Sequence, residues 1–369
     1  MKKIGLITFH RPVNFGAALQ SVALFKTIES QGAACDIIDY INPSFEKAYK
    51  PFKFSQITSI KSFLWSIARF PGENRKNKKF MRFVQRNTSL TKPLHTAEEL
   101  RAIGNQYDSY ITGSDQVWNL KCSGNETAYF LDFVSGKPKN SYAASFGDID
   151  VSDELKEQYN KLLCDFSAIS VRETVGIDIV KNITGKDCVQ TLDPTLLLND
   201  KQWAEIIRSV KPLVNEPYLL VYFMAQSDEI KREMLTLARR IANEKKYRVI
   251  VIGGSLHKKK DGINYVDAES PEDFLALFRD ASFVVTNSFH GTAFSVNFGK
   301  DFYSYVKPDL TIKGRVESLL EKIGIGDRVF SYERQIKTIE PVDFQKALSA
   351  LETERLNSIA FLRSVIYGE

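Results

Sequence analysis

The chain has 369 residues, which is too long for one ordinary hydrophobic core, so two domains are expected. Apolar residues make up 43% and charged residues 26% of the chain, a balance typical of a soluble globular protein and not of a disordered one. The net charge of +5 is mild and does not indicate a nucleic-acid partner, and no apolar run is long enough to predict a membrane span.

The cysteines and the first residues indicate a reducing, cytoplasmic location. The four cysteines are scattered, and none is spaced with another cysteine or a histidine as in a zinc site, so no metal is predicted. The apolar run at the start ends at His10 and Arg11. It is therefore interpreted as a first strand and not as a signal peptide.

In the first half of the chain, short apolar runs alternate with stretches of helical spacing. Residues 3–9 and 35–41 read as strands on either side of a helix at 14–32, the pattern of a parallel βαβ unit. Residues 44–100 are less regular. Further on, the pattern predicts strands at 108–113, 140–146 and 167–171, and a helix at 173–183.

The alternation starts afresh after a break near 199–217. Strands are predicted at 218–223 and 282–287, helices at 227–246, 270–281 and 290–299, and a long amphipathic helix at 341–366. Such alternation predicts α/β architecture with doubly wound parallel sheets. We expect a first domain at 1–205, a second at 206–340, and a C-terminal helix within 341–369 that crosses back to the first domain.

Ligands of doubly wound sheets bind beyond the carboxyl ends of the strands, so the strand-to-helix turns carry the candidate residues. One turn in the second half joins an apolar strand to a helix that begins near His290, where free N–H groups and the helix dipole favour an anion. His290 could bind that anion or donate a proton, or it could be an ordinary polar residue beside a helix cap. The turn consists of Asn287, Ser288, His290, Gly291 and Thr292.

The turns of the first half supply further candidates. Arg172 follows an apolar strand and suits a carboxylate or phosphate, although an ion pair with a neighbouring carboxylate is the alternative. Ser114 and Asp115 stand where another strand ends, and Asp115 could act as a base or only as a helix cap. Trp118 could stack on a sugar or pack in the core, and His10 could serve the same cleft.

A basic run at 75–86 reads as an amphipathic helix, RKNKKFMRFVQR. Its cations could contact an anionic membrane surface. The alternative is a solvated helix whose apolar side lies on the core.

Six motifs occur in an order that resembles the polysaccharide pyruvyl transferase family, over about residues 3–325. They are NFGAALQSVAL, ITGSDQVWN, YAASFG, SVRE, DPTLLL and TNSFHGTAFSVNFGK. The resemblance implies two Rossmann-like domains facing across a cleft, as in type B glycosyltransferases. It also implies transfer of the enolpyruvyl unit of phosphoenolpyruvate to two hydroxyls of a sugar, giving a pyruvate ketal and phosphate.

The resemblance also implies roles for individual residues. The arginine of the family's S-x-R-[DE] motif falls on Arg172, the histidine of its second domain on His290, and an acidic residue on Asp115. Family members tend to carry an arginine two residues before the histidine, and here that position holds Ser288. Lys300, Lys313 or Arg315 could replace it.

The family's acceptors are cell-envelope glycan precursors, often linked to a nucleotide or a lipid. The expected ligands are therefore phosphoenolpyruvate as donor and a sugar acceptor, with no cofactor and no nucleic acid. A lipid-linked acceptor would place the protein peripherally at the cytoplasmic face of a membrane. Two alternatives stay open: a glycosyltransferase that uses a sugar nucleotide, and a non-catalytic module that binds a glycan.

Overall fold

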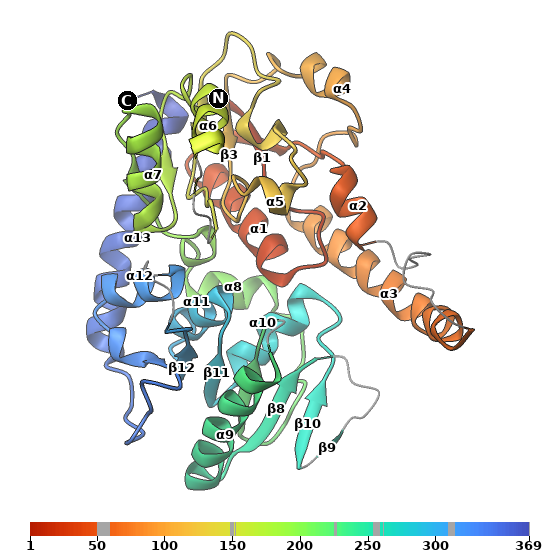
Figure 1. Ribbon diagram of the computed structural model, residues 1–369, viewed down its shortest axis with the longest axis vertical. Helices are drawn as coiled ribbons and strands as arrows, with labels where there is room; N and C mark the ends of the chain where they lie inside the picture. The colour runs from red at the N-terminus through yellow and green to blue at the C-terminus, as the bar shows by residue number, and fades with distance from the viewer. Residues whose placement is uncertain are drawn as a thin grey trace. The chain divides into compact units, whose positions relative to one another are not determined.

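The computed structural model describes residues 1–49, 60–147, 151, 153–224, 227–253, 259–260, 262–308 and 314–368 (Figure 1). The chain divides into two compact units. Unit 1 comprises Met1–Leu197 and Ser358–Glu369, and unit 2 comprises Leu198–Asn357. Each unit contains a parallel sheet with helices, which confirms the predicted α/β class with two Rossmann-like folds.

Unit 1 has a four-stranded parallel sheet in the order β2-β1-β3-β4. The strands are β1 (Lys3–Ile7), β2 (Ala34–Ile37), β3 (Ser109–Thr112) and β4 (Lys139–Ser141). A short parallel pair, β5 (Ser170–Val171) and β6 (Val189–Gln190), continues beside β4 through single bridges. Since all these strands are parallel, their carboxyl ends lie at one edge.

The helices of unit 1 differ widely in length. Helix α1 begins after Asn14, whose side chain accepts a hydrogen bond from the Ala17 amide, and it is buried along nearly its whole length. The helices are α1 (Phe15–Ser30), α2 (Pro43–Tyr49), α3 (Ile60–Asn87), α4 (Ala97–Ala102), α5 (Leu120–Ser123), α6 (Asp153–Leu163) and α7 (Thr174–Thr184). Short 3₁₀ turns occur at Ala128–Phe130 and Pro194–Leu196.

Unit 2 has a seven-stranded sheet in the order β13-β12-β11-β7-β8-β10-β9. The strands are β7 (Tyr218–Tyr222), β8 (Arg248–Ile252), β9 (Lys259–Lys260), β10 (Ile263–Val266), β11 (Phe283–Thr286), β12 (Asp301–Tyr305) and β13 (Val329–Phe330). Neighbouring strands are parallel except for β9, which runs antiparallel to β10.

The helices of unit 2 begin with a segment that we expected in the first domain. They are α8 (Asp200–Ile206), α9 (Asp228–Lys245), α10 (Pro271–Asp280), α11 (Phe289–Asn297), α12 (Arg315–Lys322) and most of α13 (Phe344–Tyr367), with a 3₁₀ turn at Gly326–Arg328. Trp203 of α8 packs its ring against Phe294 of α11, with centroids 5.3 Å apart. This contact holds α8 in unit 2, so the boundary falls after Leu197 and not after residue 205.

The last turns of α13 belong to unit 1. The Ser358 hydroxyl accepts a hydrogen bond from the Leu192 amide over 3.0 Å, and the Tyr367 hydroxyl donates one to the Gln31 carbonyl over 2.6 Å. Among the described helices, α13 included, none is both long enough and apolar enough to cross a membrane.

Candidate functional site

In unit 1 the strand order reverses between β1 and β3, which are hydrogen-bonded neighbours. From β1 the chain moves outward to β2, and from β3 it moves outward to β4 on the other side. The crevice beyond the carboxyl ends of two such central strands is where doubly wound sheets bind ligands. His10 and Arg11 follow β1, and Ser114 and Asp115 follow β3. Four polar residues therefore lie at the switch point of this sheet.

His10 is buried in a network with Asp39, which follows β2. Its Nε2 lies 2.7 Å from Asp39 Oδ1, and its Nδ1 lies 3.0 Å from the Thr8 carbonyl oxygen. Both ring nitrogens of His10 therefore lie within hydrogen-bond distance of protein oxygens. His10 therefore holds Asp39 in place, and the substrate-binding role that we expected of it stays a prediction.

Arg11 completes this network, and the sequence analysis did not select it. Its Nε and Nη2 donate to the two oxygens of Asp39 over 2.6 Å each, a bidentate pair. Burial acts to raise the pKa of Asp39, but its hydrogen bonds to His10 and Arg11 and their charges outweigh this and lower that pKa to about 2. With 27% of its side chain exposed, Arg11 is the accessible cation of the network. The signal that could have selected Arg11 in the sequence is its position directly after His10.

Ser114 and Asp115 occupy the end of β3 in different ways. Ser114 is fully buried, and its hydroxyl donates to Asp193 Oδ2 over 3.0 Å, so it ties two loops together. Its expected contact with a substrate stays a prediction. Asp115 has φ of 76°, and Ala143 at the end of β4 has φ of 49°. Such angles are uncommon for residues other than glycine, and backbone strain of this kind gathers at functional sites. The strain singles out Asp115 as the candidate here.

Arg172 follows β5 and lies in a buried cluster of charges. Its Nη1 donates to Asp193 Oδ2 over 2.9 Å, and its Nε lies 3.7 Å from Glu173 Oε2. Burial acts to lower the pKa of Arg172, but the charges of Asp193, Glu173 and Asp115 raise it. The ion pair that we kept as the alternative is therefore present, and donor binding by Arg172 stays a prediction.

Trp118 packs in the core, which is the alternative that we kept beside stacking on a sugar. Its side chain has 0% exposure. Its ring stacks on Phe130 with centroids 5.8 Å apart and meets Phe146 and Phe166 at 5.2 and 5.6 Å. A ring enclosed in this way anchors residues 113–119 to the core and offers no face to a sugar.

In unit 2 the strand order reverses between β7 and β11. The two strands end level, since Thr286 pairs with Tyr222 and its hydroxyl donates to the Tyr222 carbonyl over 2.7 Å. Asn287 and His290 follow β11 and are half-buried, and Asn287 Oδ1 accepts a hydrogen bond from the Met224 amide after β7. The predicted residues therefore lie at the switch point of the second sheet as well.

Ser288, Gly291 and Thr292 shape the start of α11 and are buried. The Ser288 hydroxyl accepts a hydrogen bond from the Gly291 amide over 3.3 Å, so it is the helix cap. A Cβ on Gly291 would lie 2.4 Å from Thr286 Oγ1, and the Thr292 hydroxyl bonds within the protein to Ser288. These three residues form the start of α11, and their expected place in the ligand site stays a prediction.

The cations proposed to replace the missing arginine fall in different places. Lys300 precedes β12, whose first residue Asp301 pairs with Phe283 at the amino end of β11, so Lys300 lies at the edge opposite His290. Lys313 lies outside the described residues. Arg315 is the first residue of α12, the helix that follows β12, which places it on the carboxyl side of the sheet.

No group of three or more His, Cys, Asp or Glu side chains within the described ranges could hold a metal ion. Both switch points instead combine backbone strain or a helix start with a few polar side chains. Such an arrangement can bind an anion and move protons at a hydroxyl.

Comparison with known proteins identifies related folds and one family. The structure is similar to a putative UDP-N-acetylglucosamine 2-epimerase from Listeria monocytogenes (TM-score 0.52, 12% identity, 97% of this chain and 90% of that chain). It is also similar to UDP-GlcNAc 2-epimerase from Neisseria meningitidis bound to UDP-GlcNAc (TM-score 0.50, 9% identity, 100% of both chains). At these identities the likeness shows the fold alone.

No curated protein sequence matches the chain. The family model for polysaccharide pyruvyl transferase matches residues 14–306, which confirms the resemblance seen in the ordered motifs. The chain therefore belongs to the polysaccharide pyruvyl transferase family.

Proposed function

We propose that this protein transfers the pyruvyl unit of phosphoenolpyruvate to two hydroxyls of one sugar in a cell-envelope glycan or its precursor. The observation that carries the proposal is the placement of family-motif residues at the switch points of both sheets. Asp115 follows β3 at the first switch point, and Asn287 and His290 follow β11 at the second. These are the positions where doubly wound sheets hold ligands.

The proposed reaction balances without a cofactor. A proton adds to the methylene carbon of phosphoenolpyruvate and leaves a cationic centre at C2. One sugar hydroxyl adds to C2, the second then displaces phosphate from C2, and a cyclic ketal results. Of the two protons that the hydroxyls release, one offsets the proton taken up by the methyl group and the other leaves with phosphate.

Each chemical role in the proposed reaction is assigned to a residue at one of the two switch points. Asp115 accepts the proton of the attacking hydroxyl, because it is the strained carboxylate at the end of β3. His290, half-buried at the start of α11, donates the proton to the enol carbon or to the departing phosphate. Arg11 offers an accessible guanidinium to an anionic group of a ligand, and Arg172 keeps its motif-based role as a donor ligand.

Two specific observations favour two alternative functions. Ser288 caps α11 where the family tends to carry an arginine, so one donor ligand differs from the family pattern. Structures of similar fold include the S. aureus MnaA–UDP complex (TM-score 0.50, 12% identity, 97% of this chain and 90% of that chain). A sugar-nucleotide-dependent glycosyltransferase is the first alternative, and a glycan-binding module without activity is the second.

The deciding experiment is calorimetric titration of the purified protein with phosphoenolpyruvate and, in parallel, with UDP-sugars. His290→Ala is the test variant, and His95→Ala, in an exposed loop, is the matched control. Phosphoenolpyruvate binding that only His290→Ala weakens, followed by phosphate release on addition of an acceptor sugar, supports the proposal. Binding of UDP-sugars alone, with transfer of their sugar, supports the first alternative.

We also propose a cytoplasmic location with peripheral contact at an anionic membrane through residues 75–86. The structure limits the form of that contact. Phe80, Phe83 and Val84 are buried in unit 1, and the ring of Phe80 lies 5.2 Å from that of Phe15 in α1. The apolar side of residues 75–86 is therefore occupied, so a contact of this stretch with a membrane would be electrostatic and would not involve its insertion.

A further inference from the structure

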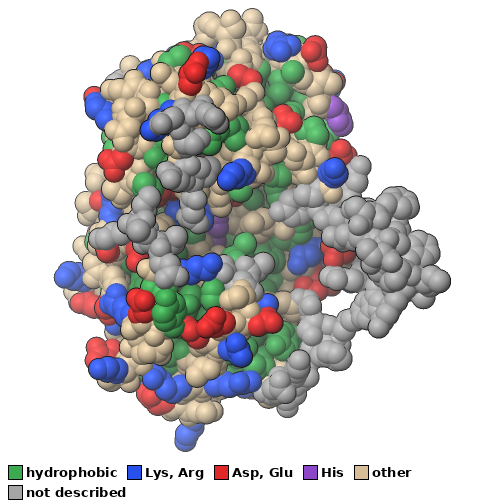
Figure 2. Space-filling view, in the orientation of Figure 1, with side chains coloured by type: hydrophobic (Ala, Val, Ile, Leu, Met, Phe, Trp, Pro, Cys, Tyr) green, Lys and Arg blue, Asp and Glu red, His purple; other side chains and the backbone are tan. Residues whose placement is uncertain are grey.

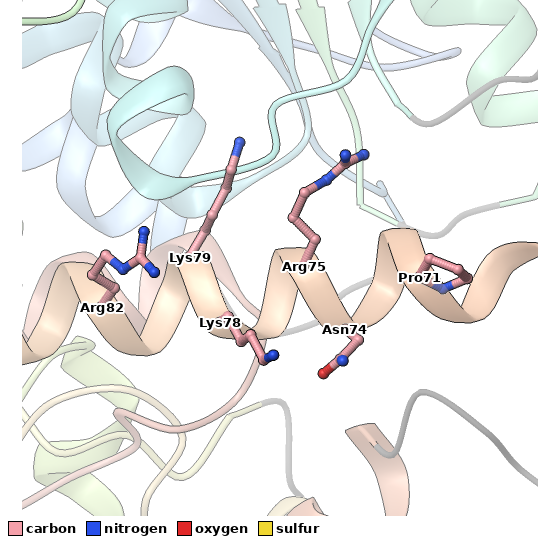
Figure 3. A pocket seen from close by; sticks show the side chains of 6 residues that line it. All are labelled: Pro71, Asn74, Arg75, Lys78, Lys79 and Arg82. Carbon is pink, nitrogen blue, oxygen red and sulfur yellow. The ribbon is translucent and has the colours of Figure 1, made fainter.

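Charged side chains lie in two different settings in this protein. On the face that Figure 2 shows, basic and acidic side chains are interspersed, and Figure 3 shows Arg75 and Lys78 of α3 pointing to opposite sides of the helix. Arg172, Glu173 and Asp193 of unit 1 are instead buried together, each with at most 4% exposure. Burying a charge costs free energy unless its partners compensate, so the partners of a buried charge indicate its role.

Glu173 stands at the start of α7 but does not cap that helix. It is the N-cap residue, and its side chain makes no capping hydrogen bond to residues 174–176, all of which the structure describes. Glutamate is not among the residues preferred at this position. Its Oε1 instead accepts hydrogen bonds from the Ser145 hydroxyl over 2.8 Å and from the Phe146 amide over 3.2 Å. The carboxylate therefore holds the segment that follows β4.

Ser145 connects this carboxylate to Asp115. The Ser145 amide donates to the Asp115 carbonyl over 3.1 Å, and the Ser145 carbonyl accepts from the Trp118 amide over 3.2 Å. Ala144 forms a parallel bridge with Asp115. These contacts hold the backbone at residue 115, where φ is 76°. A strained angle of this kind persists only where the surrounding structure enforces it, and here Ser145 is part of that structure.

The segment after β4 also packs tightly against the segment after β3. A Cβ on Gly147 would lie 2.3 Å from Gln116 Oε1, so the two residues are in close contact. The Gly147 amide donates to the Ser145 hydroxyl oxygen over 3.1 Å. A displacement of Ser145 would therefore be passed to residues 115 and 116.

We propose that Glu173 is a positioning residue that, through Ser145, fixes the direction of the Asp115 carboxylate. The inference rests on the proposed function, in which Asp115 accepts the proton of the attacking hydroxyl. Such a transfer requires hydrogen-bond contact, and a misplacement of about 1 Å can lower a rate by about 100-fold.

Two properties of Glu173 can be separated by substitution. Its length allows it to reach Ser145, and its charge lies beside Arg172, whose Nε is 3.7 Å from Glu173 Oε2. Glu173→Gln keeps the length and an Oε1 acceptor but removes the charge. Glu173→Asp keeps the charge but is one methylene shorter. Positioning depends on the length, whereas a purely electrostatic role depends on the charge.

The test uses the full chain and two measurements. The first is phosphate release from phosphoenolpyruvate with a panel of hexose glycosides and UDP-hexoses as acceptors. The second is amide hydrogen exchange in peptides covering 115–118 and 144–147, which needs no activity. Ser145→Ala joins the two Glu173 variants. Ser109→Ala is its matched control, because it removes another buried hydroxyl at the start of β3, the opposite edge of the sheet.

We expect Glu173→Asp and Ser145→Ala to lose roughly tenfold or more in kcat, with KM for phosphoenolpyruvate changed by less than about twofold. Glu173→Gln and Ser109→Ala should keep kcat within about threefold of wild type. Exchange at 115–118 should be faster in Glu173→Asp and Ser145→Ala only.

Three results distinguish the possible failures. Loss of turnover in Glu173→Gln, with Glu173→Asp close to wild type, would overturn the inference in favour of a charge role. Equal exchange at 115–118 in all variants would also overturn it. If wild type releases no phosphate while exchange still separates the variants as expected, the proposed function fails and the hold of Glu173 on residue 115 stands.

Discussion

Arg172 Nη1 donates a hydrogen bond to Asp193 Oδ2 over 2.9 Å, and the two side chains are 1% and 0% exposed. Glu173 lies on the other flank of the same guanidinium. We expect Arg172→Ala to lower the free energy of unfolding by about 3–5 kcal/mol, because it leaves buried carboxylates without their cation. Urea unfolding at pH 7 measures this. A loss below about 1 kcal/mol would mean that the ion pair does not hold these loops.

Asp193→Asn separates the structural role of Arg172 from its predicted role in donor binding. The substitution loosens the hold on the guanidinium without removing it. If Arg172 turns to the donor, the affinity for phosphoenolpyruvate rises in this variant, since one competing carboxylate is gone. Unchanged affinity together with lower stability would assign Arg172 to the scaffold alone.

Substitutions of Asp115 separate its effect on activity from its effect on stability. The residue has φ of 76°, and the cost of that backbone angle depends on the residue type placed there. We expect stability to fall in the order Asp115→Gly, Asp115→Asn, Asp115→Ala, with Ala lowest by about 1–2 kcal/mol, since a Cβ is costly in the left-handed region. All three variants lack the carboxylate and should lose transfer activity by roughly 100-fold or more. Turnover that followed the stability order would contradict the base role.

The site was predicted in part because strand-to-helix turns can be read from apolar periodicity. The helix expected at 14–32 is α1 at Phe15–Ser30, and the turn before His290 does join β11 to α11. Parallel strands bring such turns to one edge whatever the details of packing. The placement of Asp115 and His290 therefore followed from topology.

The predictions that failed depend on burial and on backbone strain, and a single sequence shows neither. The strand expected at 140–146 ends at Ser141, because the chain turns at Ala143 with φ of 49°. Trp118 has the same spacing whether it faces a ligand or the core, and only the surrounding phenylalanines decide. Arg11 was missed because its bidentate partner Asp39 is 28 residues away in sequence.

Asp39 should make stability depend on pH in acid. Its folded-state pKa is lowered to about 2, against about 3.9 for an ordinary aspartate. A lowered pKa stabilises the fold above the unfolded-state value, and that stabilisation is lost as pH falls from about 4 toward 2. Asp39→Asn should therefore be less stable than wild type by about 2 kcal/mol or more at pH 7, and the difference should shrink below pH 4. A difference independent of pH would contradict the ion-pair network.

His290 and Ser288 lie two residues apart at the start of α11 but should fail in different ways. Ser288→Ala removes the cap from the Gly291 amide, so we expect a loss of about 1 kcal/mol in stability with turnover largely kept. Ser288→Gly should lose only a few tenths of a kcal/mol in stability.

His290→Ala removes a half-buried ring that lies edge-to-face with Phe289, with centroids 5.3 Å apart, and that is not the cap of α11. Its stability should stay within about 0.5 kcal/mol of wild type, while turnover falls by roughly 100-fold or more if the imidazole transfers a proton. Single-turnover phosphate release with saturating phosphoenolpyruvate distinguishes loss of chemistry from loss of binding. Turnover within a few-fold of wild type in His290→Ala, with Ser288→Ala more impaired, would show that the helix start and not the imidazole is what the donor requires.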